Sequence, residues 1–559
     1  MSSSSRTDMT RRFREVAERV IDALLDDSPE WALDLGDARG ASRLTDRSPE
    51  ADVRRAGMLG DALASLDDID DDLLPEGDRV DLEVLRTRVS ADLWRVSELR
   101  PQSWDPLLYS PGEAVYALLE RDTLPMPERL RALAARCSAL PDHLANARAR
   151  LADGPGMPRV HVETALAQID GAHTLLADTL PALAAGEPSA PGDLESARLA
   201  ALAAVEEYGA WLRGQLPGAT ADPRLGERTY AAQLWYTLDS ELSPASLLVR
   251  AESDLIATEE ALAEAAAEYE GRPRRPGQAA EVLERLAREG ATGPDTVRQV
   301  CADALTALDR RVRELDLVTV HDDPVRIIPM PEARRGVAVA YCDPPGPLGP
   351  RAHGQDTLIA VAPPPEDWPA ERRDSFFREY NSHMLRNLMV HEALPGHALQ
   401  LAHAARHSGG TRVGRVLSSG TFTEGWAVHA EELMARHGWS EDPRENLRLR
   451  LFQLKTRLRV VLNAVLDVRL HAGDLTEAEA VALLTGRGHQ EEGEAAGKWR
   501  RAQLTSAQLS TYYVGAVEVA DIARDLAEAR PSLGERERHD AMLAHGSPPP
   551  RHLRTLLGL

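Results

Sequence analysis

Residues 391–400 read His391-Glu-Ala-Leu-Pro-Gly-His-Ala-Leu-Gln400, and helical spacing of apolar residues both precedes and follows them. On an unbroken helix, a separation of six residues would turn His397 about 240° away from His391, so the two imidazoles could not meet at one ion. Pro395 lacks the N–H that would bond the carbonyl of residue 391, and its ring clashes with that carbonyl. We therefore predict a break at Pro395-Gly396, with both imidazoles turned inward.

A second segment, Thr423-Glu-Gly-Trp-Ala-Val-His-Ala-Glu-Glu432, supplies a carboxylate to this pair. Catalytic zinc typically takes three protein N or O ligands and leaves a position for water, whose pKa falls to about 7. His391, His397 and Glu424 form such a set. The neighbouring Glu392 is the candidate general base that accepts a proton from the water.

Other chemistries are less well supported by the sequence. His403 and His407 are four residues apart, but no carboxylate base adjoins them, and we expect them to face solvent. The chain has no phosphate-binding loop of the G-x-x-x-x-G-K-[ST] type, no G-x-S-x-G elbow and no G-x-G-x-x-G fingerprint. Nucleotide and serine chemistry are therefore not indicated.

Composition excludes several classes of partner. The 559 residues include 65 Lys and Arg against 89 Asp and Glu, a net charge of −24 that argues against nucleic acids and anionic membranes as partners. Three widely spaced cysteines give no disulfide framework, and the first residues lack the apolar core of a signal peptide. We expect a cytoplasmic protein.

Helical spacing with only 4% aromatic residues predicts a mainly α protein, with amphipathic helices that include 126–152 and 194–216. Gly and Pro between 216 and 223 suggest a boundary near 225, so we expect an N-terminal helical lobe over 1–225 and a catalytic helical lobe over 226–559.

Short β-branched runs between 317 and 363 predict a small antiparallel sheet before the candidate site. A free edge of that sheet could hold an extended peptide. A surface hairpin is the alternative.

The segment 391–400, together with Thr423-Glu-Gly-Trp-Ala427, resembles the bacterial family of unknown function DUF885. Four other parts of the sequence fit the same family: Leu35-Gly36 followed by Asp46-Arg-Ser48, Tyr512-Tyr-Val-Gly515, His539-Asp540, and Gly546-Ser-Pro-Pro549. The resemblance therefore covers nearly the whole chain.

That family is similar to helical zinc peptidases of the gluzincin type, which implies a two-lobed helical body around a deep cleft. The resemblance carries the ligand roles to His391, His397 and Glu424, and the role of base to Glu392. Where the family usually has tyrosine, this chain has His429, whose role is left open.

Gluzincins often place a tyrosine or histidine beside the oxyanion that forms at the attacked carbonyl. Tyr512 and Tyr513 are the candidates here. Adjacent helical residues point about 100° apart, so at most one of them can face the cleft.

These observations predict a zinc-dependent hydrolase, either a metallopeptidase or an amidase, that acts on a peptide or small amide. The alternative is a non-catalytic helical binding protein that keeps a metal for structure. The sequence leaves open the substrate, endo- or exo-cleavage, the physiological metal and the oligomeric state.

Overall fold

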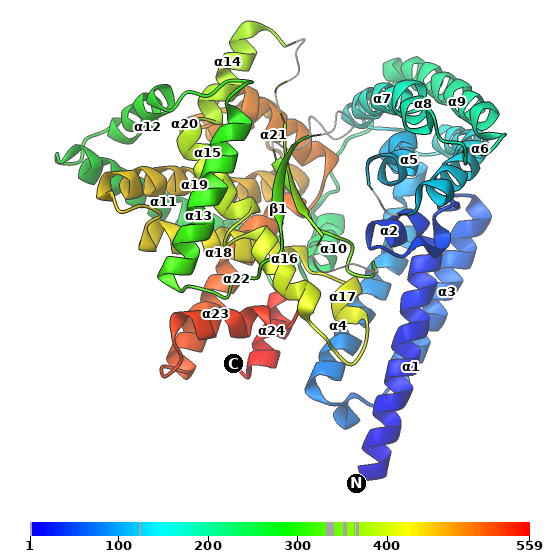
Figure 1. The fold of residues 1–559 in the computed structure, drawn as a ribbon, viewed down its shortest axis with the longest axis horizontal. Helices are drawn as coiled ribbons and strands as arrows, with labels where there is room; N and C mark the ends of the chain where they lie inside the picture. Colours follow the sequence, from blue (N-terminus) through cyan, green and yellow to red (C-terminus); the bar gives the residue numbers. More distant parts are fainter. Residues whose placement is uncertain (1–2, 122–123, 331–339, 350–354, 363, 365–367) are drawn as a thin grey trace.

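The computed structural model describes residues 3–121, 124–330, 340–349, 355–362, 364 and 368–559 (Figure 1). Most of these residues are helical, which confirms the mainly α prediction. Within these ranges, no helix combines the length and apolar character that crossing a membrane requires.

Helices α1 to α9 form the N-terminal part of the molecule, coloured blue to cyan in Figure 1. They run Ser3–Asp27, Pro29–Asp34, Pro49–Asp67, Glu76–Trp94, Pro111–Glu120, Met126–Ala152, Arg159–Thr174, Leu180–Ala184 and Leu194–Gln215. The helices predicted over 126–152 and 194–216 are confirmed as α6 and α9. One apolar core lies mainly among α5 to α9, and another mainly among α1, α3 and α4.

Helices α10 to α13 continue the chain at Glu227–Leu238, Pro244–Glu270, Gln278–Glu289 and Val297–Leu315. Helices α14 to α24 run Ala370–Glu379, Ser382–Glu392, His397–Arg406, Val413–Val416, Gly420–His437, Pro443–His471, Glu477–Gly486, Glu492–Leu504, Gln508–Ala529, Glu535–Leu543 and Pro550–Leu557. Short 3₁₀ or π turns occur at Ala38–Gly40, Asp71–Leu73, Arg95–Leu99, Pro101–Ser103, Pro106–Tyr109, Leu175–Thr179 and Leu216–Gly218.

A third apolar core is built from buried residues between Tyr230 and Leu557. The cores thus change near residue 225, where Gly and Pro interrupt the helical pattern. The division into two lobes at this residue and the deep cleft between them stay predictions.

The small sheet contains β1 (Val325–Pro329), β2 (Ala340–Asp343) and β3 (Thr357–Val361) in the order β1-β3-β2. Strand β2 pairs antiparallel with β3, but β1 pairs parallel with β3, so the expectation of an antiparallel sheet is wrong for one strand pair. The 27 residues between β1 and β3 are long enough for the crossover that a parallel pair requires. Parts of the predicted sheet region, 331–339, 350–354 and 363, lie outside the described residues.

The chain returns to the N-terminal helices immediately after α16. Val413 and Val416 of the short helix α17 are buried in the core of α1, α3 and α4. The Arg412 guanidinium donates hydrogen bonds to the carboxylates of Glu18 and Asp22 on α1. The segment that follows the helix of His397 is therefore tied to the N-terminal helices.

Candidate metal centre

The break between the two histidines is confirmed. Helix α15 ends at Glu392 and α16 begins at His397. Between them, Ala393 has φ −113° and ψ −92°, and Gly396 has φ −80° and ψ −130°, both outside the helical region. The break brings the ring centroids of His391 and His397 to 4.6 Å from each other.

Two contacts explain why the break holds this shape. A Cβ on Gly396 would lie 2.0 Å from the carbonyl oxygen of His391, so only glycine fits there. The indole Nε1–H of Trp426, a fully buried residue on α18, donates to the carbonyl of Pro395 at 2.9 Å. The backbone turn between the histidines is thus fixed from the neighbouring helix.

Helix α18 also delivers Glu424, because it crosses α22 at backbone contact. A Cβ on Gly425 would lie 2.4 Å from the carbonyl carbon of Gly515, and a Cβ on Gly515 would lie 2.0 Å from the carbonyl oxygen of Thr421. The two glycines let the helices approach closely. Glu424 on α18 and Tyr512 on α22 are brought to the same region by this crossing.

The three predicted donors converge. Oε2 of Glu424 lies 3.3 Å from Nε2 of His391 and 3.4 Å from Nε2 of His397, and the donor atoms of the group all lie within 4.8 Å of one another. Ligands at about 2.0–2.2 Å from a tetrahedral zinc ion lie about 3.3–3.6 Å apart. The two nitrogen–oxygen separations therefore match the edges of a zinc coordination tetrahedron.

Hydrogen bonding around the group also fits a cation. Nδ1 of His391 lies 2.8 Å from Oε1 of Glu431. If Nδ1 carries the proton and donates it to this carboxylate, the lone pair of Nε2 faces Glu424. Within the described residues, Oε2 of Glu424 is buried without a hydrogen-bond partner. Facing lone pairs repel unless a cation lies between them, so the residues suit a zinc ion.

Glu431 is a functional residue that the sequence reasoning missed. Its carboxylate is buried, and its Oε2 accepts a hydrogen bond of 2.6 Å from the side-chain amide of Asn387. A carboxylate behind a ligand histidine fixes the ring orientation and raises its basicity. Seven residues make almost two whole helical turns, so Glu431 shares a face with Glu424, and this spacing is the signal that could have found it.

Glu392 lies beside the group and is 7% exposed. Burial raises the pKa of its carboxyl above the ordinary value, in the direction that suits a general base. The backbone of Cys342 on β2 lies beside this carboxyl and acts to lower its pKa, against the larger effect of burial. Burial also acts to raise the pKa of Glu424. The neighbouring His397 and His391 outweigh burial and lower the pKa of Glu424 below its ordinary value.

The two tyrosines point in different directions. The Tyr513 hydroxyl donates to Asp254 of α11 at 2.7 Å in the core, so its predicted catalytic role is not supported. The hydroxyl oxygen of Tyr512 accepts hydrogen bonds from Arg501 at 3.2 Å and Gln508 at 3.4 Å. Burial and the charge of Glu424 raise the pKa of Tyr512, which places it near the candidate ligand.

The remaining histidines pack elsewhere. Burial lowers the pKa of His429 to about 3, and its ring packs between Trp426 and His539. Ring nitrogens of His403 and His407 lie 2.7 Å and 3.0 Å from backbone carbonyl oxygens, so the expectation that both simply face solvent is wrong. One ring nitrogen of each of these two histidines is therefore engaged by a backbone carbonyl oxygen.

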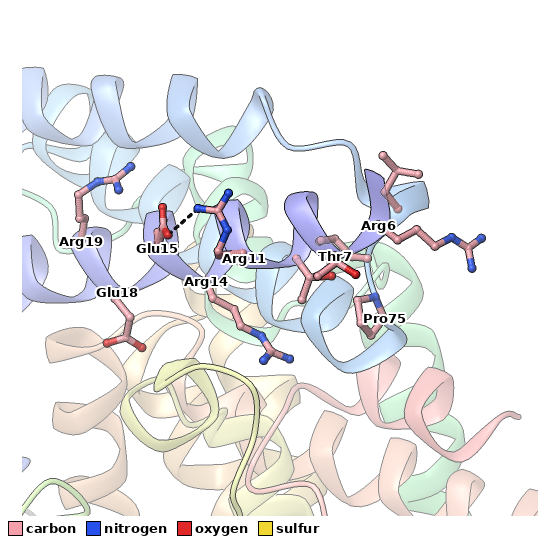
Figure 2. A pocket seen from close by; sticks show the side chains of 11 residues that line it. Arg6, Thr7, Arg11, Arg14, Glu15, Glu18, Arg19 and Pro75 are labelled. Atoms are coloured by element: carbon pink, nitrogen blue, oxygen red, sulfur yellow. Dashed lines mark hydrogen bonds and ion pairs between the residues drawn. The ribbon is translucent and has the colours of Figure 1, made fainter. Parts of the chain in front are cut away.

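A cavity of about 1130 Å³ is lined by residues of the start of α1 and of the turn at 73–75, which are distant in sequence from His391, His397 and Glu424. Figure 2 shows that α1 lines it with both arginine and glutamate side chains. Arg11 and Glu15 pair there at 3.1 Å. The lining contains none of the predicted site residues, and its charges are mixed.

Comparisons with known proteins place the chain in one family. The family model described as "Bacterial protein of unknown function (DUF885)" matches residues 29–557. No curated protein matches the chain.

Two solved structures from bacteria share the fold. A "putative lipoprotein of unknown function" from Shewanella oneidensis is 24% identical, with a TM-score of 0.82 over 98% of this chain and 100% of that one. A "putative lipoprotein" from Colwellia psychrerythraea is 16% identical, with a TM-score of 0.78 over 98% of each chain. An M32 carboxypeptidase from Deinococcus radiodurans R1 aligns over 99% of this chain and 95% of that one, at 12% identity and a TM-score of 0.41.

Proposed function

We propose that this chain, which belongs to the DUF885 family, is a zinc-dependent hydrolase that cleaves a peptide or small amide bond. The observation that carries the proposal is the convergence of His391, His397 and Glu424 next to a buried carboxylate, with Oε2 of Glu424 at 3.3 Å and 3.4 Å from the two Nε2 atoms. These three side chains are 13%, 10% and 22% exposed, so water can reach them.

Each residue of the site has a chemical task. His391, His397 and Glu424 would hold zinc, while Glu431 orients His391. When bound, zinc supplies a Lewis acid that lowers the pKa of water and polarises a carbonyl. Glu392 accepts the proton of the attacking water and passes it to the leaving amine.

Tyr512 is suited to stabilise the oxyanion. Its oxygen accepts hydrogen bonds from Arg501 and Gln508, and no residue in the described ranges accepts its own hydroxyl proton. That proton is available to donate to the oxygen of the attacked carbonyl, where a single donor contributes about 10²–10³ in kcat.

The edge strand favours an extended peptide over a compact amide. In the order β1-β3-β2, one edge of β2 has no strand partner among the described residues. Helix α15, which ends at Glu392, packs against β2, and the backbone of Cys342 acts to lower the pKa of Glu392, so β2 lies beside the proposed base. A peptide paired with β2 would present its backbone to Glu392.

We further propose a cytoplasmic enzyme with no nucleic-acid or membrane partner. The net charge of −24 opposes binding to phosphate-rich surfaces. All three cysteines are free thiols, as expected in a reducing compartment. Cell fractionation with an antibody to the native protein tests the location, and recovery in the membrane fraction would contradict it.

The function is tested with Glu392→Gln and a surface control, Glu371→Gln. Both variants are expected to keep about one zinc per chain by elemental analysis. Only Glu392→Gln should lose peptide hydrolysis by orders of magnitude, because an amide cannot accept the proton of water. Hydrolysis by Glu392→Gln at the wild-type rate would overturn the proposal.

A further inference from the structure

A cluster of five cationic side chains and three glutamates meets the proposed zinc site at Arg501, which donates to Tyr512. Three glutamates occur in this cluster, Glu379, Glu491 and Glu494. Five cations surround them: Arg378, Lys455, Arg459, Lys498 and Arg501. Glu379 pairs with Lys455 at 3.0 Å and with Arg459, Glu491 pairs with Arg378 at 2.9 Å, and Glu494 lies 3.9 Å from Lys498. The cluster therefore sets five basic side chains against three glutamates, within a chain of net charge −24.

Several members of the cluster are buried. Lys498 is 8% exposed, and burial lowers the pKa of its ammonium to about 7. Removing a cation from water costs several kcal/mol, so a buried cation needs a nearby anion or hydrogen-bond acceptor.

Arg501 is the member of the cluster without a carboxylate. It lies in the last turn of α21, and its Nη2 donates to Oε1 of Gln508 at 2.9 Å and to the Tyr512 hydroxyl at 3.2 Å. In the part of the chain that the structure describes, no carboxylate lies within ion-pair distance of it, and no acceptor meets its Nε or Nη1. The side chain is only partly buried, so a ligand can reach it.

The position of Arg501 connects this free charge to the proposed zinc site. Tyr512 bonds Arg501 and lies near Glu424. Burial by itself lowers the pKa of the Arg501 guanidinium, but Tyr512 and Glu424 raise it above its ordinary value. The guanidinium of Arg501 is thus one hydrogen bond away from the proposed oxyanion donor.

We propose that Arg501 binds a carboxylate of the substrate, so that the enzyme cleaves the amide bond next to a free carboxyl terminus. This inference rests on the proposed hydrolase function and adds its substrate class. A guanidinium offers five N–H donors in a planar fork, and those on Nε and Nη1 can meet the two oxygens of a carboxylate.

Arg501 has a competing role, because it could act only by positioning Tyr512. The two roles differ in what they change. If Arg501 binds the carboxylate, its loss raises KM only for peptides that have a free carboxyl terminus. If Arg501 positions Tyr512, its loss lowers kcat for every substrate. Peptides that differ only in the carboxyl terminus therefore separate them.

The experiment uses an N-acetylated peptide library without Asp or Glu, made once with free carboxyl termini and once with carboxyl-terminal amides. Zinc-loaded wild-type protein, Arg501→Gln and Arg500→Gln are compared by mass spectrometry of the products. Arg500 is the matched control, since it is the exposed neighbour on the same helix and contacts Glu163 and Thr164. Binding of both libraries to zinc-loaded Glu392→Gln, with and without Arg501→Gln, is measured by calorimetry.

The expected result is release of the last residue from free-acid peptides, with kcat/KM about 10- to 100-fold above that for the amides. Arg501→Gln should remove this preference through KM, and Arg500→Gln should keep it. Equal cleavage of acids and amides overturns the inference, as does an equal fall of kcat on both in Arg501→Gln. If free-acid peptides bind in an Arg501-dependent way but are not cleaved, carboxylate recognition is supported and the proposed hydrolase function is refuted. If free-acid peptides are neither bound in this way nor cleaved, the inference is overturned.

Discussion

Glu431 illustrates how one buried residue can decide whether a neighbouring histidine binds metal. Its carboxylate holds Nδ1 of His391 and is itself held by Asn387. Glu431→Gln removes the charge, so zinc affinity is expected to fall about 10- to 100-fold. The exposed neighbour Glu432→Gln should leave affinity unchanged. Titration against a competing chelator measures both, and equal affinities for the two variants would exclude this role.

The adjacent tyrosines provide a second matched pair. Tyr512→Phe removes the proposed oxyanion donor and is expected to lower kcat about 10²-fold with little change in stability. Tyr513→Phe removes the hydrogen bond to Asp254 and is expected to lower the free energy of unfolding by about 1.5–3 kcal/mol with kcat unchanged. Steady-state kinetics and urea denaturation measure these quantities. A loss of kcat in Tyr513→Phe alone would reverse the assignment.

At the scale of elements, the break between α15 and α16 depends on Gly396. A Cβ at this position would lie 2.0 Å from the His391 carbonyl oxygen, so Gly396→Ala must shift the backbone between the two histidines. We expect zinc affinity to fall by more than tenfold and Tm to drop.

Gly497→Ala is the control for this change. A Cβ at Gly497 meets no atom within 4 Å, and alanine favours a helix over glycine by about 1 kcal/mol, so Tm should hold or rise. Elemental analysis and calorimetry measure the outcome. Full zinc occupancy in Gly396→Ala would contradict the steric argument.

The break could be predicted from the sequence because its cause is local. Pro395 acts on the carbonyl four residues before it, and that interaction needs no knowledge of the rest of the fold. The same holds for helix α11, which begins at Pro244 with Ser243 as its cap, as the sequence Ser-Pro suggests.

Features that depend on distant contacts escaped the sequence. Nothing in the β-branched runs of 317–363 determines that β3 inserts between β1 and β2. The crossing of α18 and α22 requires Gly425 and Gly515 to meet, although 90 residues separate them. In the sequence, Arg501 resembles any other helical arginine. Only the structure shows that the nearby glutamates pair with other cations.

At the scale of the whole molecule, zinc binding should stabilise the N-terminal helices together with the site. The segment that follows α16 is anchored to α1 through Arg412 and buried in the N-terminal core through Val413 and Val416. Free zinc at 100 times its Kd is expected to add about 2.7 kcal/mol to the free energy of unfolding. His397→Ala should fold and lose this gain. Calorimetry with and without zinc tests it, and an equal rise of Tm in both proteins would locate the binding elsewhere.

The central claim is that one zinc ion lies between His391, His397 and Glu424. Diffraction from crystals of the zinc-loaded protein, recorded just above and just below the zinc absorption edge, locates the ion without reference to activity. The account predicts one strong anomalous peak about 2.0–2.2 Å from both Nε2 atoms and from Oε2 of Glu424. A peak at any other residues, or none at this group in zinc-saturated crystals, would contradict it.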